Sequence, residues 1–99
     1  MSIIAKRHTS PAGELIIAAC DESCLGSTFE EGSMQLDCSR QFFGGEEIDA
    51  STLSKLLKKA KTANLIGEET VAAAKQANMI DDVKMIDSVP YAHLYRIDE

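Results

Sequence analysis

Residues 14–20 have the sequence ELIIAAC, in which five apolar side chains follow one another without interruption. A continuous apolar run of this length is typical of a strand that is covered on both faces of a sheet. Residues 3–8 predict an earlier strand, and residues 9–13, with proline and glycine, predict the turn between the two. We therefore expect an antiparallel hairpin, closed by a five-residue loop, whose second strand lies near the centre of a sheet.

The remainder of the chain predicts further strands and two helices. Met34, Leu36 and Cys38 alternate with polar residues, as in a half-buried strand. Leucines at helical spacing predict a helix from about Ala50, and Gly67 followed by two glutamates predicts the start of a second. The other expected segments are a turn at 29–32, a loop at 41–47, a connector at 63–66, and strands at 83–86 and 91–97. The expected fold is α+β, with a mostly antiparallel sheet of about five short strands and two helices packed on one face.

Size and composition indicate one domain spanning residues 1–99. A hydrophobic content of 44% allows one modest core. The N-terminal segment has no signal-peptide pattern, and no apolar run approaches the ~20 residues of a membrane span. An odd number of cysteines suggests reduced thiols, so we expect a cytoplasmic protein. The first or the last strand could supply an apolar sheet edge for a homodimer.

The net charge of −6 disfavours nucleic-acid binding by the molecule as a whole, but the charge is unevenly distributed. Residues 21–49 hold eight acids and one base, whereas residues 51–66 hold four lysines and no acid. These lysines fall off the apolar stripe of the first helix and are Lys55, Lys58, Lys59 and Lys61. They could grip the phosphate backbone of RNA or an acidic protein surface, or they could form a solvated face.

The cysteines and histidines allow one metal hypothesis. Cys20, Cys24 and Cys38, with His8 or His93, could complete a set of four zinc ligands. The paired Cys-x-x-Cys spacing is absent, and two of the cysteines fall within apolar patterns. Core positions are therefore favoured, and no metal or cofactor is predicted. We expect His93, between tyrosines on the last strand, to be packed and hydrogen-bonded.

The acid-rich segment allows an enzymatic hypothesis. Asp21, Glu22 and Asp37 could hold a divalent cation for metal-assisted hydrolysis, although a solvated acidic face explains them as well. Asp21 also suits the cap of a short helical turn that ends at Gly26. Nucleophile-elbow, phosphate-loop and dinucleotide-binding motifs are all absent, so no catalytic residue is predicted and an enzyme is the less favoured interpretation.

Five short stretches together resemble a small, mostly archaeal family known as domain of unknown function 424. They are Ala19-Cys20-Asp21-Glu22, Leu25-Gly26-x-Thr28-Phe29, Phe43-Gly44-Gly45, Ala63-Asn64-Leu65-Ile66-Gly67-Glu68 and Val89-Pro90. The chain departs from the family pattern at Tyr91, where a histidine is expected. The resemblance implies a compact cytosolic archaeal protein, associated with RNA or translation, and it carries no known activity.

The leading hypothesis is a non-enzymatic binding or adaptor domain that uses the lysines against RNA or an acidic protein. Residues 42–45 (Phe42, Phe43, Gly44, Gly45) and the segment with Asn64, Gly67 and Glu68 would border a small pocket or docking surface. The remaining positions that match the family are Cys20, Asp21, Gly26 and Phe29. Glycine and asparagine also serve special backbone positions, so a structural role for this set stays open.

Overall fold

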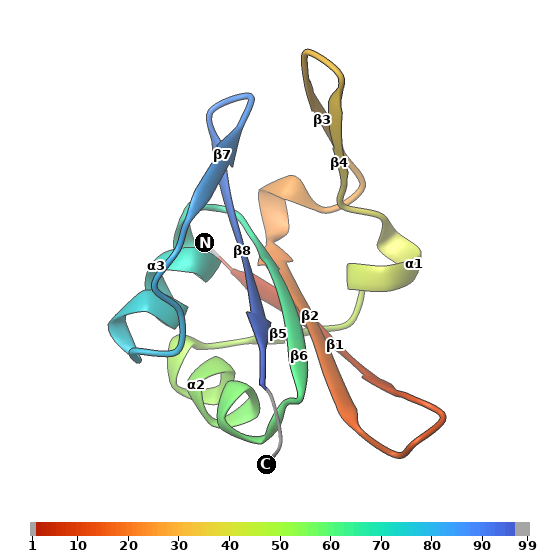
Figure 1. The fold of residues 1–99 in the computed structure, drawn as a ribbon, viewed down its shortest axis with the longest axis vertical. Helices are drawn as coiled ribbons and strands as arrows, with labels where there is room; N and C mark the ends of the chain where they lie inside the picture. The colour runs from red at the N-terminus through yellow and green to blue at the C-terminus, as the bar shows by residue number, and fades with distance from the viewer. Residues whose placement is uncertain (1, 97–99) are drawn as a thin grey trace.

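The computed structural model describes residues 2–96, which form a six-stranded sheet, a separate hairpin and four short helices (Figure 1). The strands of the sheet are β1 (Ile3–Thr9), β2 (Leu15–Asp21), β5 (Glu46–Ile48), β6 (Thr62–Ile66), β7 (Lys84–Ile86) and β8 (Val89–Tyr95). The hairpin consists of β3 (Thr28–Glu31) and β4 (Met34–Asp37). The helices are η1 (Glu22–Cys24), α1 (Arg40–Phe43), α2 (Ala50–Lys59) and α3 (Glu68–Gln76).

The sheet has the order β5-β1-β2-β6-β8-β7, and β2 lies at its centre as its apolar run predicts. All neighbouring strands are antiparallel except β2 and β6, which are parallel. The predicted α+β fold with a mostly antiparallel sheet is therefore confirmed. The sheet has one strand more than the expected five. The segments predicted as a connector and a loop add β6 and β5, whereas the strand predicted around Met34 to Cys38 is β4 of the separate hairpin and does not join the sheet.

The prediction of a connector at residues 63–66 is wrong. This segment belongs to β6, whose residues pair with β2 on one side and with β8 on the other. Ala63, Leu65 and Ile66 are buried, because a strand between two neighbours has its apolar side chains covered on both faces. The turn predicted at 29–32 is also wrong in part, since β3 extends to Glu31 before the chain reverses.

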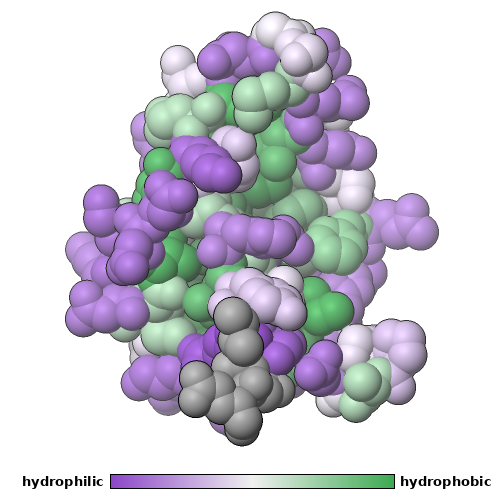
Figure 2. Space-filling view, viewed as in Figure 1, coloured by the Kyte–Doolittle hydropathy of each residue, from purple (hydrophilic) through white to green (hydrophobic). Residues whose placement is uncertain are grey.

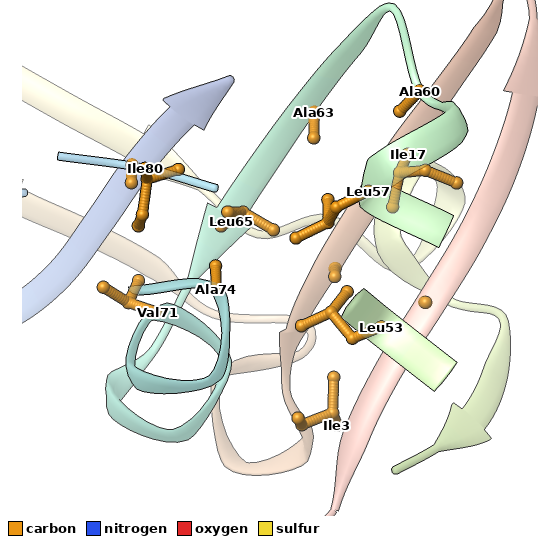
Figure 3. Close-up of a cluster of buried hydrophobic side chains, with 13 residues drawn as sticks. Ile3, Ile17, Leu53, Leu57, Ala60, Ala63, Leu65, Val71, Ala74 and Ile80 are labelled. Atoms are coloured by element: carbon orange, nitrogen blue, oxygen red, sulfur yellow. The ribbon is translucent and has the colours of Figure 1, made fainter. Parts of the chain in front are cut away.

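The helices α2 and α3 cover one face of the sheet, as predicted (Figure 1). Their side chains Leu53, Leu57 and Ala74 are fully buried against residues of the central strands (Figure 3). Helix α2 begins at its cap Asp49, whose carboxylate accepts a hydrogen bond from the Thr52 amide at 2.8 Å. This layer forms the larger of the two apolar clusters.

The opposite face is only partly covered, by η1, the β3–β4 hairpin and α1. The smaller cluster lies under these elements and consists of Ile4, Ala18, Cys20, Cys24, Cys38, Phe43 and Ile66. Beyond it, Thr62, Asn64, His93 and Tyr95 lie on the same face and are at least partly exposed. We call these four residues the open sheet face, and it positions the candidate site.

The outer strands of the sheet are β5 and β7. The first and last long strands, β1 and β8, were expected to offer a sheet edge, but each has one of these short strands beside it. Each outer strand is only three residues long and covers part of its neighbour. Lys6 to Thr9 of β1 and Ala92 to Tyr95 of β8 therefore keep one side without a paired strand among residues 2–96. In the same part of the chain, the helices lack the length and apolar content needed to span a bilayer.

Candidate functional site

A cavity of about 450 Å³ opens between α1, the end of β4 and the strands β6, β7 and β8. We call it the sheet pocket. Its apolar lining includes Leu36, Phe42, Phe43 and Ile66, and its polar lining consists of Asp37, Asn64, Asp82, Lys84, Tyr91 and His93. Figure 2 shows apolar side chains between polar ones over the region where β8 and α1 lie in Figure 1.

Strand register brings the polar groups of the pocket together. Asn64 of β6 pairs with His93 of β8, and Tyr91 pairs with both Ile66 and Lys84. Directly paired residues on one face lie close enough for their side chains to meet. Within residues 2–96 the side chains of Asn64 and His93 have no hydrogen-bond partner. The prediction of a packed, hydrogen-bonded His93 is therefore wrong, since this side chain is exposed at the pocket.

The aromatic wall of the pocket is held in place by β1. The Phe42 ring stacks on His8, with centroids 4.5 Å apart and planes 13° from parallel, and meets Phe43 edge-on at 5.3 Å. The His8 Nε2 atom lies 2.8 Å from the Phe42 carbonyl oxygen, and Lys6 donates to the Gln41 carbonyl at 2.9 Å. These contacts fix α1, a helix of only four residues, on the sheet.

Gly44 and Gly45, expected to border the pocket, do not line it. A Cβ atom at Gly45 would collide with the Ala5 carbonyl oxygen, and one at Gly44 would collide with the Arg40 carbonyl oxygen. The two glycines therefore let the chain pass from α1 into β5 in close contact with β1. Of the segment 42–45, only the two phenylalanines reach the pocket.

Asp21, Gly67 and Glu68 meet at the start of α3 rather than at the pocket. The buried Asp21 carboxylate accepts hydrogen bonds from the Glu69 amide at 3.1 Å and from the Thr70 amide and hydroxyl at 2.8 Å. Gly67 has φ of 110°, and a Cβ atom there would collide with this carboxylate. The predicted cap on η1 is wrong, because Asp21 makes no side-chain cap bond there. The role of Thr70 was not predicted, because no recognisable sequence motif marks this residue.

The remaining family positions also pack against neighbouring segments. Cys20 is fully buried, and Phe29 is half-buried against the same cluster. Gly26 has φ of 88°, a conformation that favours glycine, and its amide donates to the Cys38 carbonyl at 2.7 Å. Glu68 is exposed in the first turn of α3, where its charge suits the positive helix end.

Three of the predicted lysines, Lys55, Lys58 and Lys59, are exposed on α2, which lies on the face opposite the pocket. Lys61 was predicted to lie on the same helix, but it lies beyond the helix because α2 ends at Lys59. Its Nζ atom lies 5.6 Å from the centroid of the Tyr95 ring.

A second group of charges contains three of the predicted lysines and one arginine that was not predicted. Lys58, Lys59, Lys61 and Arg96 line a shallow depression of about 390 Å³ where β6 begins, together with Glu14. We call these four cations the basic end. Arg96 Nη2 donates to the Leu57 carbonyl at 2.9 Å, which anchors the arginine on α2. Arg96 was not predicted to belong to this group, because an isolated arginine after a strand forms no sequence pattern.

The three cysteines are buried with free thiols, as the apolar patterns predict for Cys20 and Cys38. The hydrogen bond that Cys38 donates to Cys20, together with burial, raises the pKa of Cys38 well above the usual thiol range. Burial also raises the pKa of Cys24. Groups of three or more side chains able to hold a metal ion are absent from residues 2–96. Asp37 lines the sheet pocket, whereas Asp21 caps α3.

Comparisons with known proteins identify similarity in sequence and in fold. The family described as "Protein of unknown function (DUF424)" matches residues 8–97. A crystal structure of an uncharacterized conserved protein from Methanopyrus kandleri has a similar fold, with a TM-score of 0.77 and 18% identity. The match covers 100% of this chain and 97% of the other. No curated protein matches the chain.

Proposed function

Because the chain belongs to the DUF424 family of unknown function, as its motifs predict, we propose a function from its own residues. The protein is a non-enzymatic cytoplasmic binding domain that holds single-stranded RNA. The bound RNA strand runs from the basic end across the open sheet face to the sheet pocket. The observation that carries the proposal is that Lys61 of the basic end lies 5.6 Å from the ring centroid of the exposed Tyr95, on the same sheet face as the pocket.

The basic end supplies the phosphate contacts. Lys58 and Lys59 are exposed on the last turn of α2, and Lys61 and Arg96 lie beside them. Lysine and arginine bind the phosphates of single-stranded nucleic acid and release counterions when they do so. Asp49, at the start of α2, lies about 14 Å away along the helix axis, which exceeds the Debye length of about 8 Å at physiological salt. Glu14 lines the same depression and offsets one of the four cations, so the basic end keeps a net positive charge.

The open sheet face supplies the base contacts. Tyr95 of this face is 66% exposed, and Phe42, in the wall of the adjoining sheet pocket, is 37% exposed. Sequence-tolerant binding of single strands uses aromatic rings on which bases stack, beside a positively charged track. The free thiols of the three cysteines suit the cytoplasmic location. Metal-assisted hydrolysis has less support, since its residue Asp21 is occupied in capping α3.

Fluorescence anisotropy with a labelled single-stranded RNA of mixed sequence tests the proposal. Four phosphate contacts predict a salt slope of about −2.8, so affinity falls about 50-fold between about 50 and 200 mM salt. Lys59→Glu weakens binding and reduces the slope. Lys75→Glu is the matched control, because Lys75 is exposed in the last turn of α3 and outside the basic end. Equal effects of the two variants, or equal competition by polyglutamate, contradict RNA binding at this surface.

A further inference from the structure

We propose that the sheet pocket binds a nucleobase that carries an exocyclic amino group. The proposal deepens the proposed function. It rests on that function only in one respect, namely whether the bound base belongs to an RNA strand. The source of the base is either an unpaired base of RNA or a free nucleotide. The volume of about 450 Å³ falls within the range of about 300–1,000 Å³ that is usual for small-ligand sites.

The pocket offers ring surfaces that are already in place. Phe42, Phe43 and Tyr91 line it, above a floor that includes Ile66. Because the Phe42 ring stacks on His8 and α1 is anchored to β1, the wall needs no rearrangement to receive a flat ligand. Planar heteroaromatic rings stack well on such surfaces, whereas an aliphatic chain gains nothing from their flatness.

The polar groups of the pocket are available to a ligand. Within the described residues 2–96, Asn64, His93, Lys84 and Asp82 make no side-chain hydrogen bond. Asp37 accepts a single long one, of 3.3 Å, from a threonine hydroxyl. Asn64 lies on a central strand between two paired neighbours, so its backbone cannot shift away from the cavity. Its amide offers a donor and an acceptor side by side, as the edge of a base requires.

The balance of charges selects the kind of base. Asp37 and Asp82 contribute two carboxylates against one ammonium group, that of Lys84, so acceptors predominate. The pocket therefore favours a ligand that donates N–H groups. Adenine, cytosine and guanine each carry an exocyclic amino group, and uracil does not. The same carboxylates repel a phosphate, so the phosphate of the bound nucleotide lies outside the pocket.

The phosphate of a nucleotide bound in the pocket lies on the side of the pocket that faces the basic end. Along β8, Tyr95 follows His93 by two residues, or about 7 Å. Lys61 lies over the Tyr95 ring. A base in the pocket therefore places its phosphate on the path toward the four cations, and an adjoining nucleotide over the open sheet face.

The experiment is an NMR titration of the whole chain with the monophosphates of adenosine, guanosine, cytidine and uridine, and with ribose 5-phosphate. We expect the amino-bearing nucleotides to shift the Asn64 and His93 signals, with dissociation constants below about 10 mM. Uridine monophosphate and the sugar phosphate bind at least about ten-fold more weakly, because they lose a hydrogen bond to a charged acceptor. Asn64→Ala and Asp82→Asn weaken binding of the amino-bearing nucleotides. Lys75→Glu, which lies outside the pocket and the basic end, changes their binding less than two-fold.

Each outcome decides between the claims. Equal binding of uridine and adenosine monophosphates, or of ribose 5-phosphate, overturns the proposal, as does the absence of any shift at the pocket. If mononucleotides bind there but RNA does not bind at all, the pocket is a free-nucleotide site and the RNA function falls. If RNA binds through Lys59 with no effect of Asn64→Ala or Asp82→Asn, the RNA function stands and the pocket proposal falls.

Discussion

Asp21→Ala removes the carboxylate at the end of β2 that caps the start of α3. Three hydrogen bonds end on this carboxylate, two from backbone amides and one from the fully buried Thr70 hydroxyl. The substitution leaves these donors without their acceptor, at about 1 kcal/mol for each. We therefore expect the free energy of unfolding to fall by about 3 kcal/mol. This corresponds to a decrease in Tm of about 12–24 °C for a domain of this size.

The assay is urea unfolding followed by far-UV circular dichroism, with Asp49→Ala as the matched control. Asp49 caps α2 through one hydrogen bond at an exposed position, so its loss costs about 1 kcal/mol. RNA and nucleotide binding by the folded Asp21→Ala protein should stay unchanged, because Asp21 lies outside the pocket lining. A cost for Asp21→Ala no greater than for Asp49→Ala would refute the capping argument. Lost binding without lost stability would show instead that Asp21 belongs to a functional site.

Two more stability measurements follow from the buried contacts. Gly67→Ala should cost about 2–4 kcal/mol, because it combines a positive φ with a collision against Asp21. In the Asp21→Ala background the same change should cost less in urea unfolding, and additive costs would contradict the collision. The pKa values of Cys38 and Cys24 are raised in the folded protein above 9.0, so the neutral thiols stabilise it below that pH. Stability measured by thermal unfolding should therefore decline as the pH rises above about 9, and less so in Cys38→Ala; an unchanged decline in that variant would point to other groups.

The elements that sequence patterns predicted correctly are those whose causes are local. The apolar run 14–20 is long enough to indicate a strand covered on both faces, and Leu53 and Leu57 repeat with the helical period. In both cases the burial pattern follows directly from neighbours within the same element. Gly67 with its following glutamates likewise marked the start of α3 within one residue.

The misses arise where the cause is a distant partner. Asp21 is followed by residues that can form a short helical turn, yet its carboxylate binds amides 48 and 49 positions away. Strand β6 is short and carries Asn64 in its middle, which weakens the apolar pattern of a central strand. That polar residue faces the sheet pocket, and functional positions are the ones expected to break a local rule. The convergence of His93 and Asn64 depends on register, which a single strand does not reveal.

The parallel pairing of β2 with β6 has a consequence for the order in which the protein folds during synthesis. The first hairpin can close as soon as it leaves the ribosome, because its strands are neighbours in the chain. The central strand β2, however, stays uncovered on one side until Thr62 and the residues after it emerge, and β6 in turn waits for β8. Such distant contacts slow folding, and an apolar strand left waiting promotes association between nascent chains. The ELIIAAC segment is therefore open to such association until β6 and β8 have emerged.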